Sequence, residues 1–135
     1  MRTAGPALLA ALVAAATSAA AQQPSGFKSP TGNIHCQSFE SEVRCDIAQL
    51  SSPIPPKPRD CELDWGRAFA VAANSRSGAR ICHGDTAMDD SLPVLAYGGV
   101  WRRGGLTCTS EQTGVTCSNP QGHGFSISRA VQRLF

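Results

Sequence analysis

Apolar and polar residues alternate along two stretches of the chain, and each stretch has a short polar centre. The stretches cover residues 33–47 and 105–119. Alternation on both sides of a turn is typical of an antiparallel hairpin, because successive side chains of a strand point to opposite faces. The pattern therefore predicts two hairpins of similar construction.

The two predicted hairpins also share a motif. Each has two cysteines nine positions apart, with matching residues before both of them. Gly-x-Ile-x-Cys at 32–36 corresponds to Gly-x-Leu-x-Cys at 104–108, and Val-x-Cys at 43–45 corresponds to Val-x-Cys at 115–117. In hairpins of this kind the two cysteines face one another directly.

The six cysteines indicate three disulfides in an oxidising compartment. Six cysteines permit 15 pairings, but directly opposed residues of a hairpin lie close to disulfide range. The expected disulfides are Cys36–Cys45, Cys108–Cys117 and, by elimination, Cys61–Cys82. Metal binding by cysteine is the alternative, but zinc sites favour cysteines separated by two to four residues, and the sequence has no such pair.

Turn signals and prolines divide the rest of the chain. Four of the six residues at 53–58 are proline, which excludes a helix or a central strand and predicts an extended connector. A stiff surface loop explains this connector better than a ligand for an aromatic groove. Residues 65–73 fit either a strand or a short helix. The other expected elements are a returning strand at 79–82, a strand at 92–100 interrupted by two glycines, a strand at 124–127 and a helical turn at 129–134 capped by Ser128.

Several short strands separated by turns predict an all-β fold. We expect a small disulfide-stapled β-sandwich or barrel of short antiparallel strands, with a short C-terminal helical turn. After the first 21 residues, 41 of 114 residues are apolar, and only 26 of these are neither Ala nor Cys. A domain with so few large apolar residues depends on its disulfides, and this composition excludes a long helical bundle and a multidomain enzyme.

The first 21 residues have the layout of a secretory signal. Arg2 precedes an Ala/Leu/Val run at 7–16, and alanines then occupy the small-residue positions of a cleavage site. The run is too short to span a bilayer, which needs about 20 residues. We expect a periplasmic or secreted protein with a signal peptide at 1–21, cleavage near Ala21/Gln22, a linker at 22–26 and a single disulfide-rich domain at 27–135.

Charge is nearly balanced after this segment, with 11 Lys and Arg against 10 Asp and Glu. Nucleic-acid binding requires a basic stripe, whereas Arg102-Arg103 is the only adjacent basic pair. We therefore expect no nucleic-acid partner. We also expect no membrane span, and a monomer whose partner is an envelope or extracellular component.

A histidine lies between two glycines at 122–125. A hydrolase would use His123 as a general base, Asp85 to orient it, and Ser126 or Ser128 as the nucleophile. However, no G-x-S-x-G elbow is present, Ser126 falls on an expected strand, and His123 also fits a simple turn. The chain is therefore not expected to be an enzyme, and these residues are kept as alternative catalytic candidates.

Metal and cofactor sites are not expected. His35, His83 and His123 would have to converge from distant positions to bind zinc. The acidic residues at 85–90 lack the pattern of an EF-hand calcium loop.

Four large aromatic residues lie near polar turns, and packing in the core is the first expectation for them. They are Trp65, Tyr97, Trp101 and Phe125. Trp101 is the one expected to be partly exposed, because two arginines follow it. The candidate binding residues are Trp101, Tyr97 and His123.

A set of short motifs occurs through the chain in a fixed order. They are Ser29-Pro30-Thr31-Gly32-Asn33-Ile34-x-Cys36, Val43-Arg44-Cys45-Asp46-Ile47, Cys61-x3-Trp65-Gly66, Cys82-x-Gly84-Asp85-Thr86, Tyr97-Gly98, Gly114-Val115-Thr116-Cys117-x-Asn119 and Gly122-His123-Gly124-Phe125-x-Ile127-Ser128-Arg129. Over residues 27–135 the set resembles a family of small secreted actinobacterial and proteobacterial proteins known only as a domain of unknown function. The chain departs from the pattern at Ala96, where Pro is expected before Tyr97. The resemblance implies export and a cysteine-stapled fold, and it supplies no catalytic residue.

These observations favour a binding or interaction module of the cell envelope, because the domain is small and no catalytic arrangement stands out. Two alternatives stay open. One is a small extracytoplasmic hydrolase that uses His123. The other is a structural envelope protein, which would have neither a cleft nor an exposed aromatic patch.

Overall fold

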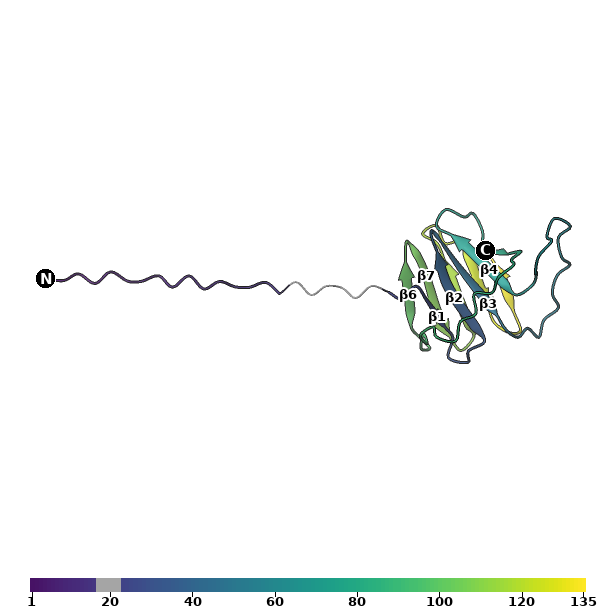
Figure 1. The fold of residues 1–135 in the computed structure, drawn as a ribbon, viewed down its shortest axis with the longest axis horizontal. Helices are drawn as coiled ribbons and strands as arrows, with labels where there is room; N and C mark the ends of the chain where they lie inside the picture. The colour runs from purple at the N-terminus through teal and green to yellow at the C-terminus, as the bar shows by residue number, and fades with distance from the viewer. Residues whose placement is uncertain (17–22) are drawn as a thin grey trace.

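The computed structural model describes residues 1–16 and 23–135 of the chain. Residues 1–16 contain no helix or strand and are exposed, and the folded domain begins at Gly26 (Figure 1). The expected cleavage site near Ala21/Gln22 lies outside the described residues. In the two described ranges, no helix is long and apolar enough to cross a membrane.

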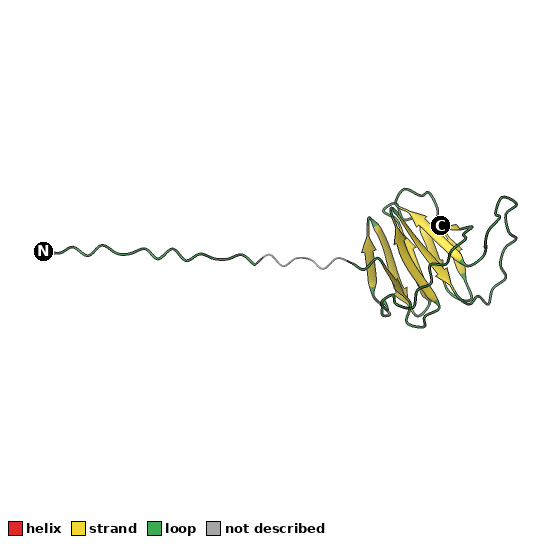
Figure 2. Ribbon diagram, viewed as in Figure 1, coloured by secondary structure: helices red, strands yellow, loops and turns green. Residues whose placement is uncertain are grey.

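The domain consists of two five-stranded antiparallel sheets, and the described residues contain no helix (Figure 2). The first sheet contains β1 (Gly26–Lys28), β2 (Ile34–Phe39), β3 (Glu42–Ile47), β4 (Ala68–Ala72) and β5 (Ala79–Arg80). The second contains β6 (Val100–Arg103), β7 (Leu106–Glu111), β8 (Gly114–Ser118), β9 (Gly124–Ile127) and β10 (Gln132–Leu134). In both sheets the strands follow one another in chain order. The predicted all-β fold is confirmed, and it is a sandwich.

The two predicted hairpins are β2–β3 and β7–β8. Their cysteines are directly paired across the strands, as the nine-residue spacing predicts. The structure contains the disulfides Cys36–Cys45, Cys108–Cys117 and Cys61–Cys82, with Cα–Cα distances of 4.0, 4.1 and 5.8 Å. The first two bridges therefore lie within the sheets, and the third joins loops.

Each sheet contributes one row of laterally paired residues to the core, and both rows have the same order: aromatic, Cys, Cys, aromatic. The rows are Phe27–Cys36–Cys45–Phe69 and Trp101–Cys108–Cys117–Phe125. All eight side chains are buried. The ring centroids of Phe27 and Trp101 are 5.9 Å apart, and those of Phe69 and Phe125 are 6.1 Å apart. The centre of the core is therefore two matching rows packed face to face.

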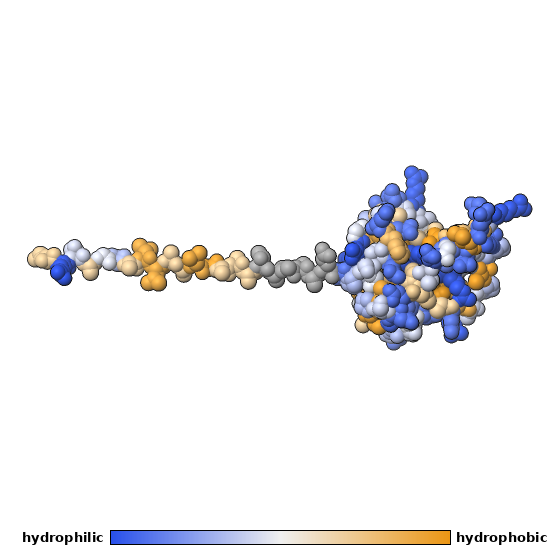
Figure 3. Space-filling model, viewed as in Figure 1, coloured by the Kyte–Doolittle hydropathy of each residue, from blue (hydrophilic) through white to orange (hydrophobic). Residues whose placement is uncertain are grey.

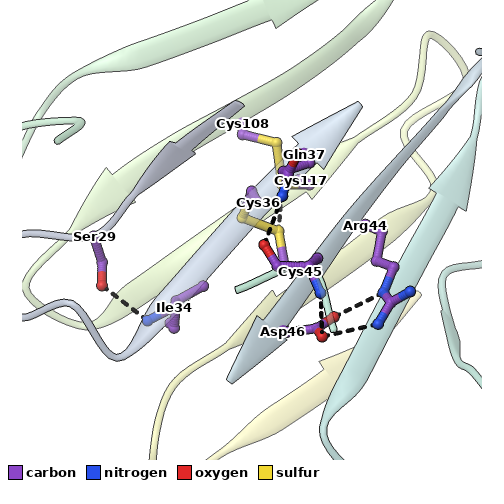
Figure 4. Close-up of a disulfide and its surroundings, with 10 residues drawn as sticks. Ser29, Ile34, Cys36, Gln37, Arg44, Cys45, Asp46, Cys108 and Cys117 are labelled. Carbon is purple, nitrogen blue, oxygen red and sulfur yellow. Dashed lines mark hydrogen bonds and ion pairs between the residues drawn. A yellow bond between two sulfur atoms is a disulfide. The ribbon is translucent and has the colours of Figure 1, made fainter. Parts of the chain in front are cut away.

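The two central disulfides meet in the middle of these rows. The Sγ atoms of Cys45 and Cys117 are 3.7 Å apart, and Figure 4 shows the two bridges side by side between the sheets. Sulfur is a soft, apolar atom that packs like a hydrocarbon. The bridges thus serve as core side chains as well as cross-links, which compensates for the small number of large apolar residues.

The C-terminal segment is a strand, so the expected helical turn at 129–134 is wrong. Ser128 does bind backbone groups, but it closes a turn and does not cap a helix. The Ser128 hydroxyl accepts a hydrogen bond from the backbone amide of Val131 at 3.1 Å. The backbone amide of Ser128 donates to the Val131 carbonyl at 2.8 Å. This turn sends β10 back along β9.

Two other segments are now assigned. Residues 65–73, which fitted a strand or a helix, contain the buried strand β4. The strand expected at 92–100 is wrong, because residues 92–99 form only an isolated bridge between Val94 and Lys28, and Val100 begins β6. Gly98, with φ of 83°, then turns the chain into β6.

Two long connections belong to the first half of the chain, at 48–67 and 81–99. Connections of this length are uncommon and are usually functional. The Cys61–Cys82 bridge joins them, and Asp64 and His83 exchange two backbone hydrogen bonds of 2.9 and 3.1 Å. The proline-rich part of 48–67 projects from the sandwich (Figure 1).

Candidate functional site

Turns from both sheets surround a groove of about 610 Å³ at one end of the sandwich. It is lined by Ser29 and residues 31–34, 48–49, 97, 111–114 and 128–130. Most of these residues belong to connections between strands, so the groove lies where the sheets end. Its volume is within the range of about 300–1,000 Å³ that is usual for ligand sites.

Tyr97 is the one aromatic residue of the groove, and its backbone is firmly held. The amide of Gly99 donates to the carbonyl of Ala96 at 2.8 Å, which closes a tight turn around Tyr97. Gly98 supplies the positive φ that this turn needs, so the turn forms without the proline expected at position 96. Gly98 and Gly99 are also hydrogen-bonded to the backbone of Ser110 in β7, at 2.7 and 3.0 Å. The Tyr97 side chain is 45% exposed.

Asn33 fixes the opposite wall of the groove. Its side-chain oxygen accepts from the backbone amide of Gln49 at 2.8 Å, and its side-chain nitrogen donates to the backbone carbonyl of Gln49 at 3.2 Å. The amide of Ala48 also donates to the Asn33 carbonyl at 2.8 Å. The start of the 48–67 connection is therefore attached to the turn between β1 and β2.

Four polar side chains around the groove make no hydrogen bond to any described residue. They are Gln49, Tyr97, Gln112 and Arg129. The charged side chains Glu111 and Arg129 form no ion pair within the part of the chain that the structure describes. The groove thus presents amide, hydroxyl and guanidinium groups that remain available to a ligand.

A second polar cluster lies on the outer face of the first sheet. Arg44 and Asp46 of β3 form a bidentate ion pair with both N–O distances at 2.8 Å (Figure 4). Asp46, which is 3% exposed, also accepts from the Ala87 amide at 2.8 Å and from the Thr86 hydroxyl at 3.3 Å. Buried charges are retained in proteins when they are paired in this way.

The same cluster reaches into the 81–99 connection through His83. Its Nδ1 lies 3.1 Å from the Arg44 guanidinium and 2.7 Å from the Asp85 carbonyl. An adjoining hollow of about 300 Å³ is lined partly by Asp64, Trp65 and His83. Because the charged atoms of Arg44 and Asp46 are bonded to the 83–87 segment, the cluster holds this segment on the sheet.

Three of the catalytic candidates, His123, Asp85 and Ser126, are not linked to one another by hydrogen bonds among the described residues. The Asp85 carbonyl accepts from Arg44. The Ser126 hydroxyl lies 2.8 Å from the Thr116 hydroxyl. His123 lies in the turn between β8 and β9, where its amide donates to the Asn119 side chain at 3.0 Å. Within the described ranges, no hydrogen bond joins the His123 imidazole to Asp85 or Ser126.

The expected partial exposure of Trp101 is wrong, because this side chain is 1% exposed. Trp101 packs on Phe27, and its indole nitrogen donates to the Pro24 carbonyl at 2.8 Å. Strand alternation explains the difference: Val100 and Arg102 point outward from β6, and Trp101 points inward. Of the three candidate binding residues, Tyr97 lies in the groove and is exposed, and His123 is half-buried in its turn.

The histidines considered for zinc occupy three different places. His35 donates from Nε2 to the Gly32 carbonyl at 3.0 Å, whereas His83 lies beside Arg44 and His123 lies in the β8–β9 turn. Within the described residues, one group of three potential ligand atoms lies within 4.8 Å, and it consists of the Cys36, Cys45 and Cys117 sulfurs. These sulfurs are all in disulfides.

Sequence reasoning did not identify the groove or the Arg44–Asp46 pair as sites. A signal for the pair was present, because Arg44 and Asp46 flank the inward-facing Cys45 and so share the outer face of the predicted strand. For the groove the sequence indicated only Tyr97, because the walls of the groove come from segments far apart in the chain. Figure 3 shows polar and apolar side chains intermingled on one face of the domain, with no extensive apolar patch there.

Comparison with known proteins gives a family and no activity. No curated protein matches the chain, and no solved structure matches it. One family model, described as a family of unknown function (DUF6636), matches residues 7–135. Because this match covers nearly the whole chain, the chain belongs to the DUF6636 family.

Proposed function

We propose that this protein is exported and acts by binding a ligand in the end groove. The observation that carries the proposal is the set of four polar side chains around the groove that make no hydrogen bond within the described residues. The surrounding backbone is already ordered by turn hydrogen bonds. A preformed site of this kind loses little conformational entropy on binding.

The compartment is the first part of the proposal. Three disulfides accord with an oxidising space outside the cytoplasm, and the first 21 residues have the layout of an export signal. The test is to express the chain in a bacterial host and measure the intact mass of the protein recovered outside the cytoplasm. We expect a chain that starts at Gln22 and lacks six hydrogens. A cytoplasmic chain that keeps Met1 would contradict export.

Binding accounts for the groove better than the two alternative functions. A hydrolase built on His123 gains no support, because within the described residues no hydrogen bond joins the His123 imidazole to Asp85 or Ser126, and the Ser126 hydroxyl bonds to Thr116. A purely structural envelope protein would have neither a cleft nor an exposed aromatic patch, and the end groove is a cleft that argues against this alternative.

Ligand retention tests the binding proposal. The exported, oxidised protein is immobilised and exposed to soluble fragments from an enzymatic digest of bacterial envelopes. We expect the parent to retain fragments and a Tyr97→Ala/Gln112→Ala variant to lose them. Phe39→Ala is the matched control, because Phe39 is 46% exposed and lies at the other end of β2 from the groove. Equal retention by all three proteins, or by none, would refute binding in the groove.

A further inference from the structure

We infer that the ligand of the end groove is a neutral glycan strand. This inference rests on the proposed function and adds the chemical class of the ligand. Three features of the groove carry it: the kind of polar side chain left without a partner, the presentation of Tyr97, and the state of the nearest strand edge.

The unpartnered side chains match hydroxyl groups. Gln49 and Gln112 each carry a planar amide with both donors and an acceptor, and Tyr97 carries a hydroxyl that does both. A sugar hydroxyl also donates and accepts, so adjacent hydroxyls on one ring can bond to both ends of an amide. Arg129 adds donors, and Glu111 adds acceptors.

The charges of the groove are balanced. Its lining contains one cation, Arg129, and one anion, Glu111. Polyanions are bound by several Lys or Arg side chains together, and such a set is absent from this lining. A neutral ligand with many hydroxyls fits one charge of each sign better than a phosphate-rich or strongly cationic ligand does.

Tyr97 provides the apolar part of the site. Tyr97 is 45% exposed, and the turn that carries it is hydrogen-bonded to β7, so its backbone loses little freedom on binding. Aromatic rings of this kind combine an apolar face with a polar tip. The C–H face of a sugar ring can stack on such a face while its hydroxyls reach the amides.

A peptide is the competing ligand, and the groove suits it less. Extended peptides are bound by adding a strand to a free sheet edge. Two sheet edges, those of β1 and β10, begin near the groove, and the outer side of β1 is already occupied. The backbone amide of Lys28 donates to the Pro93 carbonyl at 2.9 Å, and its backbone carbonyl accepts from the Leu95 amide at 2.9 Å. On its β1 side the groove therefore offers side chains from turns and no open main-chain edge.

Calorimetric titration of the exported, oxidised protein tests the ligand class. The probes are chitotriose and maltotriose as neutral glycans, trialanine as a peptide, and inorganic phosphate as an anion. We expect saturable binding of at least one triose and none of trialanine or phosphate. Tyr97→Ala should weaken triose binding by at least about tenfold, as the loss of an aromatic anchor does, and Tyr97→Phe should keep most of it. Phe39→Ala should leave it unchanged.

The outcomes separate the two proposals. Triose binding that is lost in Tyr97→Ala and kept in Phe39→Ala supports the inference, and triose binding that Tyr97→Ala leaves intact overturns it. If only trialanine or phosphate binds, and Tyr97→Ala abolishes that binding, the glycan class is wrong but the groove remains the site. If no probe binds and the envelope digest is not retained either, both the inference and the proposed function fail. A circular dichroism spectrum of each variant confirms that it is folded.

Discussion

The two halves of the chain are built to one plan and differ in what connects the strands. Strands β1–β5 and β6–β10 form separate sheets of the same order, each with a cross-strand disulfide at its centre. In the first half, the connection after β3 covers residues 48–67, whereas the corresponding connection after β8 covers only 119–123. The shared strands make the centre of the core, and the additional loops pack Leu50 and Leu95 against it.

The difference shows how the groove arises. Gln49 lies near the start of the 48–67 connection, Tyr97 lies near the end of the 81–99 connection, and Gln112 belongs to a short turn of the second half. The groove therefore needs both halves, and it lies where the extra loops of one meet the turns of the other. The core residues that both halves repeat stabilise the fold. The groove residues of the two long connections, which the second half does not repeat, are the ones to examine for function.

Removal of either central disulfide should have the largest effect on stability, and it tests whether the two halves are equivalent. The Cys36→Ala/Cys45→Ala and Cys108→Ala/Cys117→Ala variants should each lower the free energy of unfolding by about 3–5 kcal/mol. Each pair loses a cross-link and also leaves space beside the facing disulfide. Urea unfolding followed by circular dichroism measures both losses. If one variant is as stable as the parent, the halves are not equivalent.

The third disulfide belongs only to the loops of the first half. Its removal in Cys61→Ala/Cys82→Ala should lower the free energy of unfolding by about 3 kcal/mol, because it closes a loop of 21 residues. Amide hydrogen exchange should then rise in 48–67 and 81–99, while β7 and β8 stay protected. A uniform rise in exchange across both sheets would show that this bridge also holds the core.

The outer faces of the two sheets differ, because the first carries the Arg44–Asp46 ion pair. Asp46→Asn removes a buried charge partner and should lower the free energy of unfolding by about 2–3 kcal/mol. The motif match places Ser118 at the equivalent position of the second half, where its hydroxyl holds no loop. Ser118→Ala should change stability by less than about 0.5 kcal/mol. Equal effects in the two variants, measured by urea unfolding, would contradict the role of the pair in holding residues 83–87.

The smallest expected effect is on pH dependence. Hydrogen bonds from the Ser91 hydroxyl and the Ser91 amide, at 2.6 and 2.9 Å, hold the pKa of the Asp89 carboxyl below its ordinary value. A carboxyl whose pKa is lower in the folded state stabilises the fold at pH values above its unfolded pKa of about 3.9. This stabilisation is lost as the pH falls through the pKa of the folded state.

Thermal unfolding at several pH values measures this contribution. Asp89→Asn should have a slightly lower Tm than the parent at pH 6, and the two curves should converge at strongly acidic pH. A difference that grows as the pH falls would have the wrong sign and would contradict this account of Asp89.

The sequence predicted the hairpins well because two local signals agreed. Residue alternation defined the inward face, and the nine-residue spacing placed the cysteines opposite one another. Ser128 shows where a local signal is ambiguous, since a serine that binds a nearby amide begins a helix in one context and closes a turn in another. Trp101 is buried although two arginines follow it, because strand alternation sets the direction of a side chain and the polarity of the next residues does not.

Features that depend on the meeting of distant segments were not predictable in the same way. The contact between Cys45 and Cys117 requires the two sheets to stack in one particular alignment, and alternation within each sheet does not specify it. The groove brings together turns around Asn33, Tyr97, Gln112 and Arg129. Each of these turns, taken alone, is an ordinary polar connection.

The most direct test of the central claim is a chemical-shift titration of the isotope-labelled, exported protein with chitotriose. If the groove between the two halves binds a neutral glycan, the backbone amides around Tyr97, Gln112 and Arg129 should shift in a saturable way. The amides of the β2–β3 and β8–β9 turns should stay in place. The absence of any shift, or shifts that cluster away from the groove, would contradict the account.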